Sequence, residues 1–207
     1  MARLIDGTRP KRRRGNGDRS RGAVSASLRV CGLLALVAIV AAGVTTRFGF
    51  STFEVASASM EPTLDCAGAP RCRSLHGDKV LVSSWIYRFR PVERGDIVVA
   101  AAPARWCGGV TPLVKRVVAV PGDTVEQAGG RVRVDGKLVG GKPVAGPSPY
   151  VSQRTHRELR LASKHYFLMG DNRGASCDSR WFGSVPRRLI ESKVVGVYRP
   201  LRRLRLF

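Results

Sequence analysis

Residues 114–120 read Val114-Lys115-Arg116-Val117-Val118-Ala119-Val120, and Pro121-Gly122-Asp123 follows them directly. A short run rich in β-branched residues that ends at a Pro-Gly turn is typical of a β-strand. Because side chains alternate between the two faces of a strand, we expect Lys115 on the same face as Leu113 and Val117. A lysine on an apolar face is costly unless it is neutral or paired. The run therefore predicts a strand and makes Lys115 a candidate functional residue.

Further runs of the same kind lie before and after this strand. They cover residues 78–83, 96–101, 131–134, 137–139 and 192–198. Asp135-Gly136 separates two of them and is the strongest short signal for a β-hairpin. Short strands with regular turn signals predict a mainly β domain, built as a compact sandwich or barrel. Residues 187–192 are the one helical candidate of note in this part of the sequence.

An apolar segment precedes the predicted strands. Residues 30–46 carry no charge, and the segment extends back to Val24 with Arg29 as its one charged residue. A helix needs about 20 residues to span a bilayer, and an arginine near its end can reach the interface. We predict a retained transmembrane helix over residues 24–46. The alternatives are a buried core helix and a cleaved signal peptide, with Ala41-Ala42-Gly43 as its small residues.

The formal net charge of +21 calls for an anionic partner. Much of the excess lies near the two ends of the chain, and one of those ends precedes the apolar segment. No zinc-finger spacing and no aromatic stacking motif of the RNA-binding kind accompanies the charge. A lipid bilayer is therefore the expected partner, and nucleic acid is not.

The chain is predicted to have four parts. Residues 1–23 form a basic, disordered arm, residues 24–46 the membrane helix and residues 48–200 the β domain. Residues 201–207 form a basic tail, with the membrane surface and a sheet edge as alternative locations. The positive-inside rule places the arm in the cytoplasm and the β domain outside the cell membrane.

A serine-rich motif lies between the apolar segment and the first predicted strand. Residues 57–64 read Ser57-Ala58-Ser59-Met60-Glu61-Pro62-Thr63-Leu64. A serine hydroxyl is a poor nucleophile and needs a base. The three histidines form no recognisable Ser/His/Asp arrangement, whereas a buried lysine can act as the base because burial disfavours its ammonium form.

Four motifs resemble those of the bacterial type I signal peptidases, in the same order. They are S-x-S-M-x-P-T-L at residues 57–64, R-G-D-I-V-V at 94–99, the lysine motif at 114–118 with its Pro-Gly-Asp, and G-D-N-R-x-x-S-x-D-S-R at 170–180, completed by Gly183. Four motifs in order after one apolar segment are a specific signal. The resemblance covers roughly residues 30–200.

The resemblance implies a serine–lysine mechanism. Ser59 would be the nucleophile and Lys115 the general base. The Ser57 hydroxyl and the Ser59 N–H would form the oxyanion hole. Ser176 would form a hydrogen bond with Lys115 Nζ. The alternative for Ser57 and Ser176 is that they are ordinary hydrogen-bonding surface residues.

Two ion pairs are also implied by the resemblance. Asp171 would pair with Arg116, and Asp178 with Arg180. These charged residues would brace the site and would not take part in the chemistry.

The implied substrates are exported preproteins whose signal peptides carry small residues at positions −1 and −3 of the cleavage site. No cofactor is expected, and no group of residues has the spacing of a metal site.

One alternative function is a dedicated maturation peptidase of the same clan with a narrow substrate, for example of the conjugation or pilin type. Others are a catalytically inactive membrane-anchored binding protein and an autocleaving DNA-binding repressor. The repressor would need a helix-turn-helix, for which residues 1–29 are too short and too rich in Gly and Arg.

The five cysteines suggest at least one disulfide. Cys66 and Cys72 would lie in an extracytoplasmic loop, where disulfides persist, and their pairing is favoured. Cys107 and Cys177 are candidates for a second bridge, but spacing does not fix connectivity. Cys31 lies in the predicted membrane helix.

Overall fold

The computed structural model describes residues 30–40, 43, 49–68, 72, 74, 76–103, 105–109, 112–128, 131–140 and 157–207. The chain divides into two compact units, Met1–Val44 and Thr45–Phe207. In the first unit, residues 30–40 are helical and exposed. None of the helices in the described ranges is long and apolar enough to cross a membrane. The predicted arm over residues 1–23 and the rest of the predicted span over 24–46, Gly43 apart, fall outside the described residues.

The second unit contains a large antiparallel sheet. Its eight strands run in the order β1-β2-β11-β3-β4-β9-β10, and β12 pairs with β11. The strands are β1 (Phe50–Glu54), β2 (Lys79–Ser83), β3 (Ile97–Ala100), β4 (Leu113–Ala119), β9 (His165–Met169), β10 (Val185–Pro186), β11 (Ile190–Arg199) and β12 (Arg205–Leu206).

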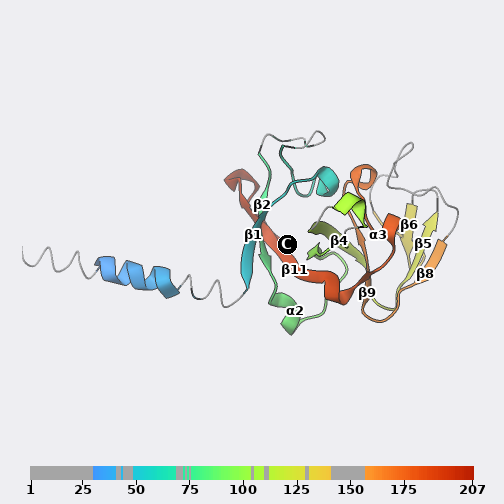
Figure 1. The fold of residues 1–207 in the computed structure, drawn as a ribbon, viewed down its shortest axis with the longest axis horizontal. Helices are drawn as coiled ribbons and strands as arrows, with labels where there is room; N and C mark the ends of the chain where they lie inside the picture. The colour runs from blue at the N-terminus through green and yellow to red at the C-terminus, as the bar shows by residue number, and fades with distance from the viewer. Residues whose placement is uncertain are drawn as a thin grey trace, which may run out of the picture. The chain divides into compact units, whose positions relative to one another are not determined.

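A smaller antiparallel sheet has the strand order β7-β6-β5-β8. It consists of β5 (Thr124–Ala128), β6 (Arg131–Val134), β7 (Lys137–Leu138) and β8 (Arg157–Arg160). Figure 1 shows β5, β6 and β8 on the side of the domain that lies away from β1 and β2.

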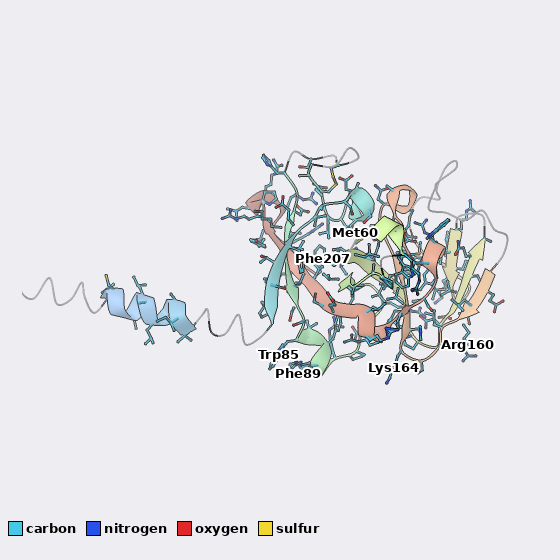
Figure 2. The ribbon with its side chains drawn as sticks, in the orientation of Figure 1. Met60, Trp85, Phe89, Arg160, Lys164 and Phe207 are labelled. Atoms are coloured by element: carbon cyan, nitrogen blue, oxygen red, sulfur yellow. A yellow bond between two sulfur atoms is a disulfide. The ribbon has the colours of Figure 1, made fainter. Side chains whose placement is uncertain are left out.

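Seven short helical elements join these strands in the described ranges. The α-helices are α2 (Ile86–Phe89) and α3 (Ser179–Phe182). The 3₁₀ turns are η1 (Ala58–Met60), η2 (Cys107–Gly109), η3 (Arg173–Ala175), η4 (Arg187–Leu189) and η5 (Leu201–Arg203). Figure 2 shows Met60 on η1, and Trp85 and Phe89 at α2.

The mainly β prediction is confirmed, and its details are partly corrected. Within the described residues no pairing joins β1 to β10, so the large sheet is open, a curled half-barrel where a compact sandwich or barrel-like domain was expected. The predicted hairpin is present, because Asp135 and Gly136 both have positive φ (49° and 72°) between β6 and β7. The helix predicted over residues 187–192 is wrong. Only a 3₁₀ turn forms there, because Ile190 already pairs with Ala100 of β3.

Three clusters of buried apolar side chains form the core of this unit. One of them joins the segment around η1 to the large sheet, with Met60 and Leu64 packed among residues of β2, β3 and β11. Met60 and Leu64 are 1% and 0% exposed. Because buried apolar side chains are held in close packing, this cluster fixes the chain on both sides of Ser59.

The basic tail lies at a sheet edge, which was one of its two predicted locations. Arg205 pairs with Val197 and Leu206 with Gly196 at the end of β11. Just ahead of this strand, Arg203 donates hydrogen bonds to the buried carboxylate of Asp78 and to the Thr63 carbonyl. The tail is therefore tied to the segment that follows Ser59.

Candidate active site

Ser59 lies in the 3₁₀ turn η1, which begins directly after the exposed Ser57. Its side chain is almost completely buried, at 6% exposure. The turn follows β1, whose residues Phe50–Glu54 pair with Ser83–Lys79 of β2. Strand β1 and the buried Met60 therefore hold Ser59 at one fixed place beside the large sheet.

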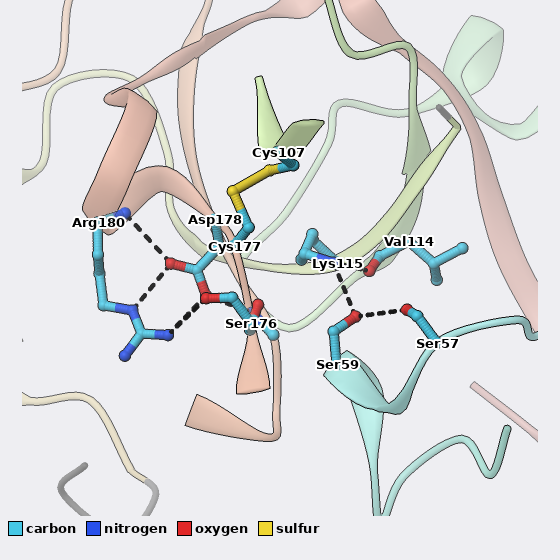
Figure 3. Close-up of a disulfide and its surroundings, with 10 residues drawn as sticks. Ser57, Ser59, Cys107, Val114, Lys115, Ser176, Cys177, Asp178 and Arg180 are labelled. Carbon is cyan, nitrogen blue, oxygen red and sulfur yellow. Dashed lines mark hydrogen bonds and ion pairs between the residues drawn. A yellow bond between two sulfur atoms is a disulfide. The ribbon is translucent and has the colours of Figure 1, made fainter. Parts of the chain in front are cut away.

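Lys115 reaches Ser59 from the centre of the large sheet. It lies on β4, where Leu113, Lys115 and Val117 are buried and the residues between them are partly exposed, so the predicted alternation is confirmed. Lys115 Nζ donates a hydrogen bond to Ser59 Oγ at 2.8 Å and another to the Val114 carbonyl at 3.0 Å. Figure 3 shows the two side chains pointing toward each other.

Burial changes the ionisation of Lys115. The loss of hydration disfavours the ammonium form and lowers the pKa of Lys115 from 10.5 to about 8. The carboxylates of Asp178 and Asp171 act in the opposite direction, since negative charge favours the ammonium form, but their effect is smaller. At neutral pH an appreciable fraction of Lys115 is therefore neutral, as a proton acceptor must be.

The Ser57 hydroxyl adds a second polar group beside the Ser59 hydroxyl. Ser57 Oγ and Ser59 Oγ are hydrogen-bonded to each other at 3.1 Å. Because Ser57 is exposed whereas Ser59 and Lys115 are buried, Ser57 lies at the open side of the site. An exposed hydroxyl next to the nucleophile can donate to an incoming substrate oxygen.

Ser176 does not make the hydrogen bond predicted for it. Its Oγ is completely buried and has no hydrogen-bond partner among the described residues. The side chain lies instead against Gly170, where a β-carbon would overlap both Ser176 and the Ser59 carbonyl. The structure therefore brings Ser176 beside η1 without joining it to Lys115. We refer to η1 (Ala58–Met60) as the nucleophile turn, after the role that the motif resemblance implies for Ser59.

Asp171 and Arg116 form the predicted ion pair. Arg116 Nε and Nη2 donate to the two Asp171 carboxylate oxygens at 2.9 and 2.7 Å. Burial alone would raise the pKa of Asp171, but hydrogen bonds from Arg116 and Thr63 outweigh it, and the pKa is lowered. Since Thr63 follows the nucleophile turn, Asp171 links that turn to β4.

Asp178 and Arg180 also pair as predicted, and both side chains are fully buried. Arg180 Nε and Nη2 each lie 2.8 Å from a carboxylate oxygen of Asp178. Asp178 accepts further hydrogen bonds from the backbone N–H groups of Arg180 and Gly170. These hydrogen bonds offset part of the cost of burying two charges, although Arg180 Nη1 is buried without a partner among the described residues, and they fix the loop that carries Ser176.

Asn172 is a site residue to which sequence reasoning gives no role. Its backbone N–H donates to the Ser59 carbonyl, and its side-chain Nδ2 donates to the Ala58 carbonyl, both at 3.0 Å. The available signal is its place in the Gly-Asp-Asn run at residues 170–172, within the last motif. The motif alone does not reveal that Asn172 donates two hydrogen bonds to the nucleophile turn.

Two disulfides are present. The favoured Cys66–Cys72 bridge is confirmed, and the candidate second bridge, Cys107–Cys177, is formed as well. Cys177 lies directly between Ser176 and Asp178, so the second bridge ties the loop ahead of β4 to the last motif, as Figure 3 shows.

A ring contact reinforces the second bridge. Trp106, next to Cys107, stacks on Phe182 of α3 with ring centroids 4.2 Å apart. The segments that carry Lys115 and Ser176 are thus joined at two points.

The assembled groups suit acyl transfer. A buried hydroxyl contacts a lysine that is partly neutral at pH 7, and a second hydroxyl lies beside it at the open side. Groups of these types in this arrangement could act as a nucleophile, a base and a donor for a developing oxyanion. In the described part of the chain, no three His, Cys, Asp or Glu side chains gather in a way that could hold a metal ion.

Comparisons with known proteins agree on one family. The family model described as signal peptidase, peptidase S26, matches residues 28–199. A probable signal peptidase I-2 of Synechocystis is 30% identical, over 81% of this chain and 71% of that protein. Signal peptidase I V of Bacillus subtilis is 30% identical, over 80% of this chain and 93% of that protein.

One solved structure is also similar. It is a signal peptidase I from Enterococcus faecalis, 24% identical, with a TM-score of 0.39 over 51% of this chain and 97% of that chain.

Proposed function

The chain belongs to the signal peptidase family, peptidase S26, and on this premise we propose that its activity depends on a catalytic dyad of Ser59 and Lys115. The protein is a serine endopeptidase that cleaves signal peptides from exported preproteins. The observation that carries the proposed dyad is the 2.8 Å hydrogen bond between Lys115 Nζ and Ser59 Oγ inside a buried site.

In the proposed mechanism, neutral Lys115 accepts the Ser59 proton as Ser59 Oγ attacks the carbonyl carbon of the scissile peptide. The Ser57 hydroxyl and the Ser59 N–H donate to the oxygen, which becomes negatively charged. The Lys115 ammonium then gives its proton to the leaving amine, and the acyl-enzyme forms. Water deprotonated by Lys115 hydrolyses the ester and restores Ser59.

The surrounding residues would hold the dyad in place. The Asp171–Arg116 pair connects β4 to the segment after Ser59. The Asp178–Arg180 pair fixes the loop of Ser176, which packs beside the nucleophile turn. We assign these five residues to positioning, because the four charged side chains bond to each other and to backbone, and the Ser176 side chain packs against Gly170.

We also propose a single membrane anchor over residues 24–46, with the N-terminus in the cytoplasm and the catalytic domain outside. Its support is the uncharged run at residues 30–46 and the basic residues that precede it. An anchor of this kind would hold the dyad close to the bilayer from which signal peptides emerge.

The proposed substrates have small residues, usually alanine, at positions −1 and −3. The narrower alternative is a maturation peptidase with one dedicated substrate. Incubation of the solubilised enzyme with several unrelated preproteins separates the two, because a general signal peptidase cleaves them all and a dedicated enzyme cleaves one.

The dyad is tested with the full chain purified in detergent and one preprotein as substrate. Ser59→Ala should abolish cleavage and leave thermal unfolding unchanged, since only the attacking oxygen is lost. Ser84→Ala, an exposed serine bonded to the Gly49 carbonyl, is the matched control and should cleave normally. Substantial turnover by a homogeneous Ser59→Ala preparation would exclude Ser59 as the nucleophile.

A further inference from the structure

The nucleophile turn is held from outside by the first residues of the last motif. Asn172 Nδ2 donates to the Ala58 carbonyl, and the Asn172 N–H donates to the Ser59 carbonyl, both at 3.0 Å. Two consecutive carbonyl groups of the turn are therefore bound by one residue. These residues are more than a hundred positions apart in sequence, so the contact belongs to the tertiary structure.

The first of these hydrogen bonds acts on the peptide that contains the Ser59 N–H. The Ala58 carbonyl and the Ser59 N–H belong to the same planar unit, and in a trans peptide they point in opposite directions. The bond between Ala58 and Ser59 is not among the cis bonds of the described chain. The Ala58 carbonyl accepts from the Glu61 N–H within the turn at 3.2 Å and from Asn172 Nδ2 at 3.0 Å. The Asn172 side chain adds an outside donor to this carbonyl, and fixing the carbonyl also fixes the direction of the Ser59 N–H on the far side.

The Ser59 N–H is free to serve a substrate. Within the described residues it donates to no protein acceptor, whereas the Met60 carbonyl and the Ala58 carbonyl are both engaged. A hydrogen bond to the carbonyl of an amide also polarises the N–H of that amide, which makes it a stronger donor. The contact with Asn172 can thus both aim and strengthen the Ser59 N–H.

Asn172 is itself held rigidly. Its backbone is tied to Ser59, and its neighbour Asp171 is tied to Arg116 of β4 through two hydrogen bonds. Gly170 lets this segment approach the turn, because a β-carbon there would overlap the Ser59 carbonyl. A side chain that is fixed at its base can impose a direction on the group that it binds.

We propose that Asn172 is a positioning residue that holds the Ala58–Ser59 peptide so that the Ser59 N–H points at the oxygen of the scissile carbonyl. This inference rests on the proposed function, in which that N–H is an oxyanion donor. It assigns to Asn172 a role in transition-state stabilisation through another group, without contact with the substrate. The side-chain amide is required because the role is that of a donor: an aspartate of the same shape is ionised at neutral pH and can only accept.

The test compares Asn172→Ala and the isosteric Asn172→Asp with wild type, as full chains in detergent. We expect kcat to fall by about 10- to 100-fold, less than the about 10²–10³-fold typical of losing an oxyanion donor outright. KM should change by no more than about twofold, because the developing charge exists only in the transition state. In Asn172→Ala the acidic limb of the pH profile should stay in place, because Asn172 does not contact Lys115. In Asn172→Asp the added carboxylate should move that limb to higher pH, as the Asp171 and Asp178 carboxylates also raise the pKa of Lys115, so kcat is compared on the plateau above it. Ser84→Ala removes one side-chain bond to a carbonyl far from the site and should match wild type.

A second measurement distinguishes a role of Asn172 in orienting the Ser59 N–H from a role in the stability of the fold alone. Ser59 adds to a peptide aldehyde: the Oγ–carbon bond forms, the carbonyl π pair moves to the oxygen, and the hydroxyl proton passes to Lys115. The adduct oxygen then occupies the oxyanion position. Affinity for a peptide aldehyde ending in alanine should fall in parallel with kcat in both variants, whereas affinity for the matching peptide alcohol should not change.

Two kinetic results would overturn the proposal. One is an unchanged kcat in Asn172→Ala or Asn172→Asp. The other is a loss of kcat while the folded protein keeps its affinity for the aldehyde. Circular dichroism and binding of the peptide alcohol measure the fraction of protein that is folded. Should Asn172→Ala not fold, Asn172→Asp carries the same comparison, and if neither variant folds, Asn172 is a stability residue and the proposal is wrong. Failure of the proposed function gives a different result from failure of this inference. In that case the wild-type protein would not cleave preproteins, or the Ser59→Ala variant would still cleave them.

Discussion

Lys115 is buried and forms a direct hydrogen bond with Ser59, the proposed nucleophile, and its ionisation should govern the pH dependence of cleavage. Because burial lowers its pKa to about 8, the inactive ammonium form dominates below that pH. We predict that kcat/KM rises with pH through an apparent pKa near 8 and falls about tenfold for each pH unit below it. A pH profile of preprotein cleavage in detergent measures this.

Two substitutions check that Lys115 is the group whose ionisation causes the loss of activity at low pH. Lys115→Arg should be inactive at every pH, since arginine stays charged. Lys115→Ala should also be inactive. A retained acidic limb with useful activity in Lys115→Ala would mean that another residue is the base.

The burial of Lys115 should also lower the free energy of unfolding. Its pKa is about 8 in the folded chain against 10.5 as the ordinary value, so between these pH values the unfolded chain binds the proton more tightly. Stability should therefore rise with pH through this window, and the full cost, about 3 kcal/mol, is present below pH 8. We predict that Lys115→Met is inactive but more stable than wild type at pH 7 by about that amount. Urea unfolding at pH 7 and pH 10 measures the difference, which should shrink at the higher pH.

A wild-type protein that is more stable than Lys115→Met at pH 7 would contradict this account. It would indicate that Lys115 is stabilised in the folded state by its charge.

At the scale of elements, the site depends on how two loops meet over β4. The loop before β4 carries Cys107 and Trp106, and the last motif carries Cys177 ahead of α3. The disulfide joins positions 70 residues apart, so it removes much more freedom from the unfolded chain than the Cys66–Cys72 bridge, which spans 6. In the chain-entropy model the longer loop contributes roughly 4 kcal/mol and the shorter one roughly 2 kcal/mol.

We predict that the double variant Cys107→Ser/Cys177→Ser loses roughly 4 kcal/mol of stability and most of its activity. The activity should fall because the loop of Ser176 and Asp178 is no longer tied to the segment ahead of Lys115. Cys66→Ser/Cys72→Ser is the matched control, with roughly half the loss of stability. Denaturant unfolding and cleavage rates are measured on both, and equal effects of the two double variants would refute the special role of the longer bridge.

At the scale of the whole molecule, the distribution of charge and apolar residues predicts the topology. The basic residues before residue 30 favour a cytoplasmic N-terminus, and the uncharged run to residue 46 has the length of a span. We predict that a tag fused after Phe207 is digested by protease added to intact spheroplasts, whereas a tag before Met1 is protected. Protection of the tag after Phe207 with loss on lysis would reverse the orientation and undo the proposed anchor topology.

Local pattern alone determines several features of this protein. The alternation in residues 113–117 places Lys115 on a buried face, and the burial of its neighbours agrees. Asp135-Gly136 makes a hairpin because both residues accept positive φ. The resemblance of the four motifs to those of the family predicts the partners of both ion pairs, which are formed, and it supplies the nucleophile and base that are proposed above. These features follow from the period of a strand, the conformation of a turn and the chemistry of a motif, which are all present in the sequence.

Other features depend on contacts between segments that are far apart in the chain. Residues 187–192 have a helical pattern, yet pairing of β11 with β2 and β3 takes Ile190 onward into a strand. The Cys107–Cys177 bridge and the Asn172 contacts with the nucleophile turn are of the same kind. So is the position of Ser176, which packs against Gly170 where a hydrogen bond to Lys115 was expected. A sequence specifies which groups are available, but the register of the strands and the close packing of the core decide which of them come within bonding distance.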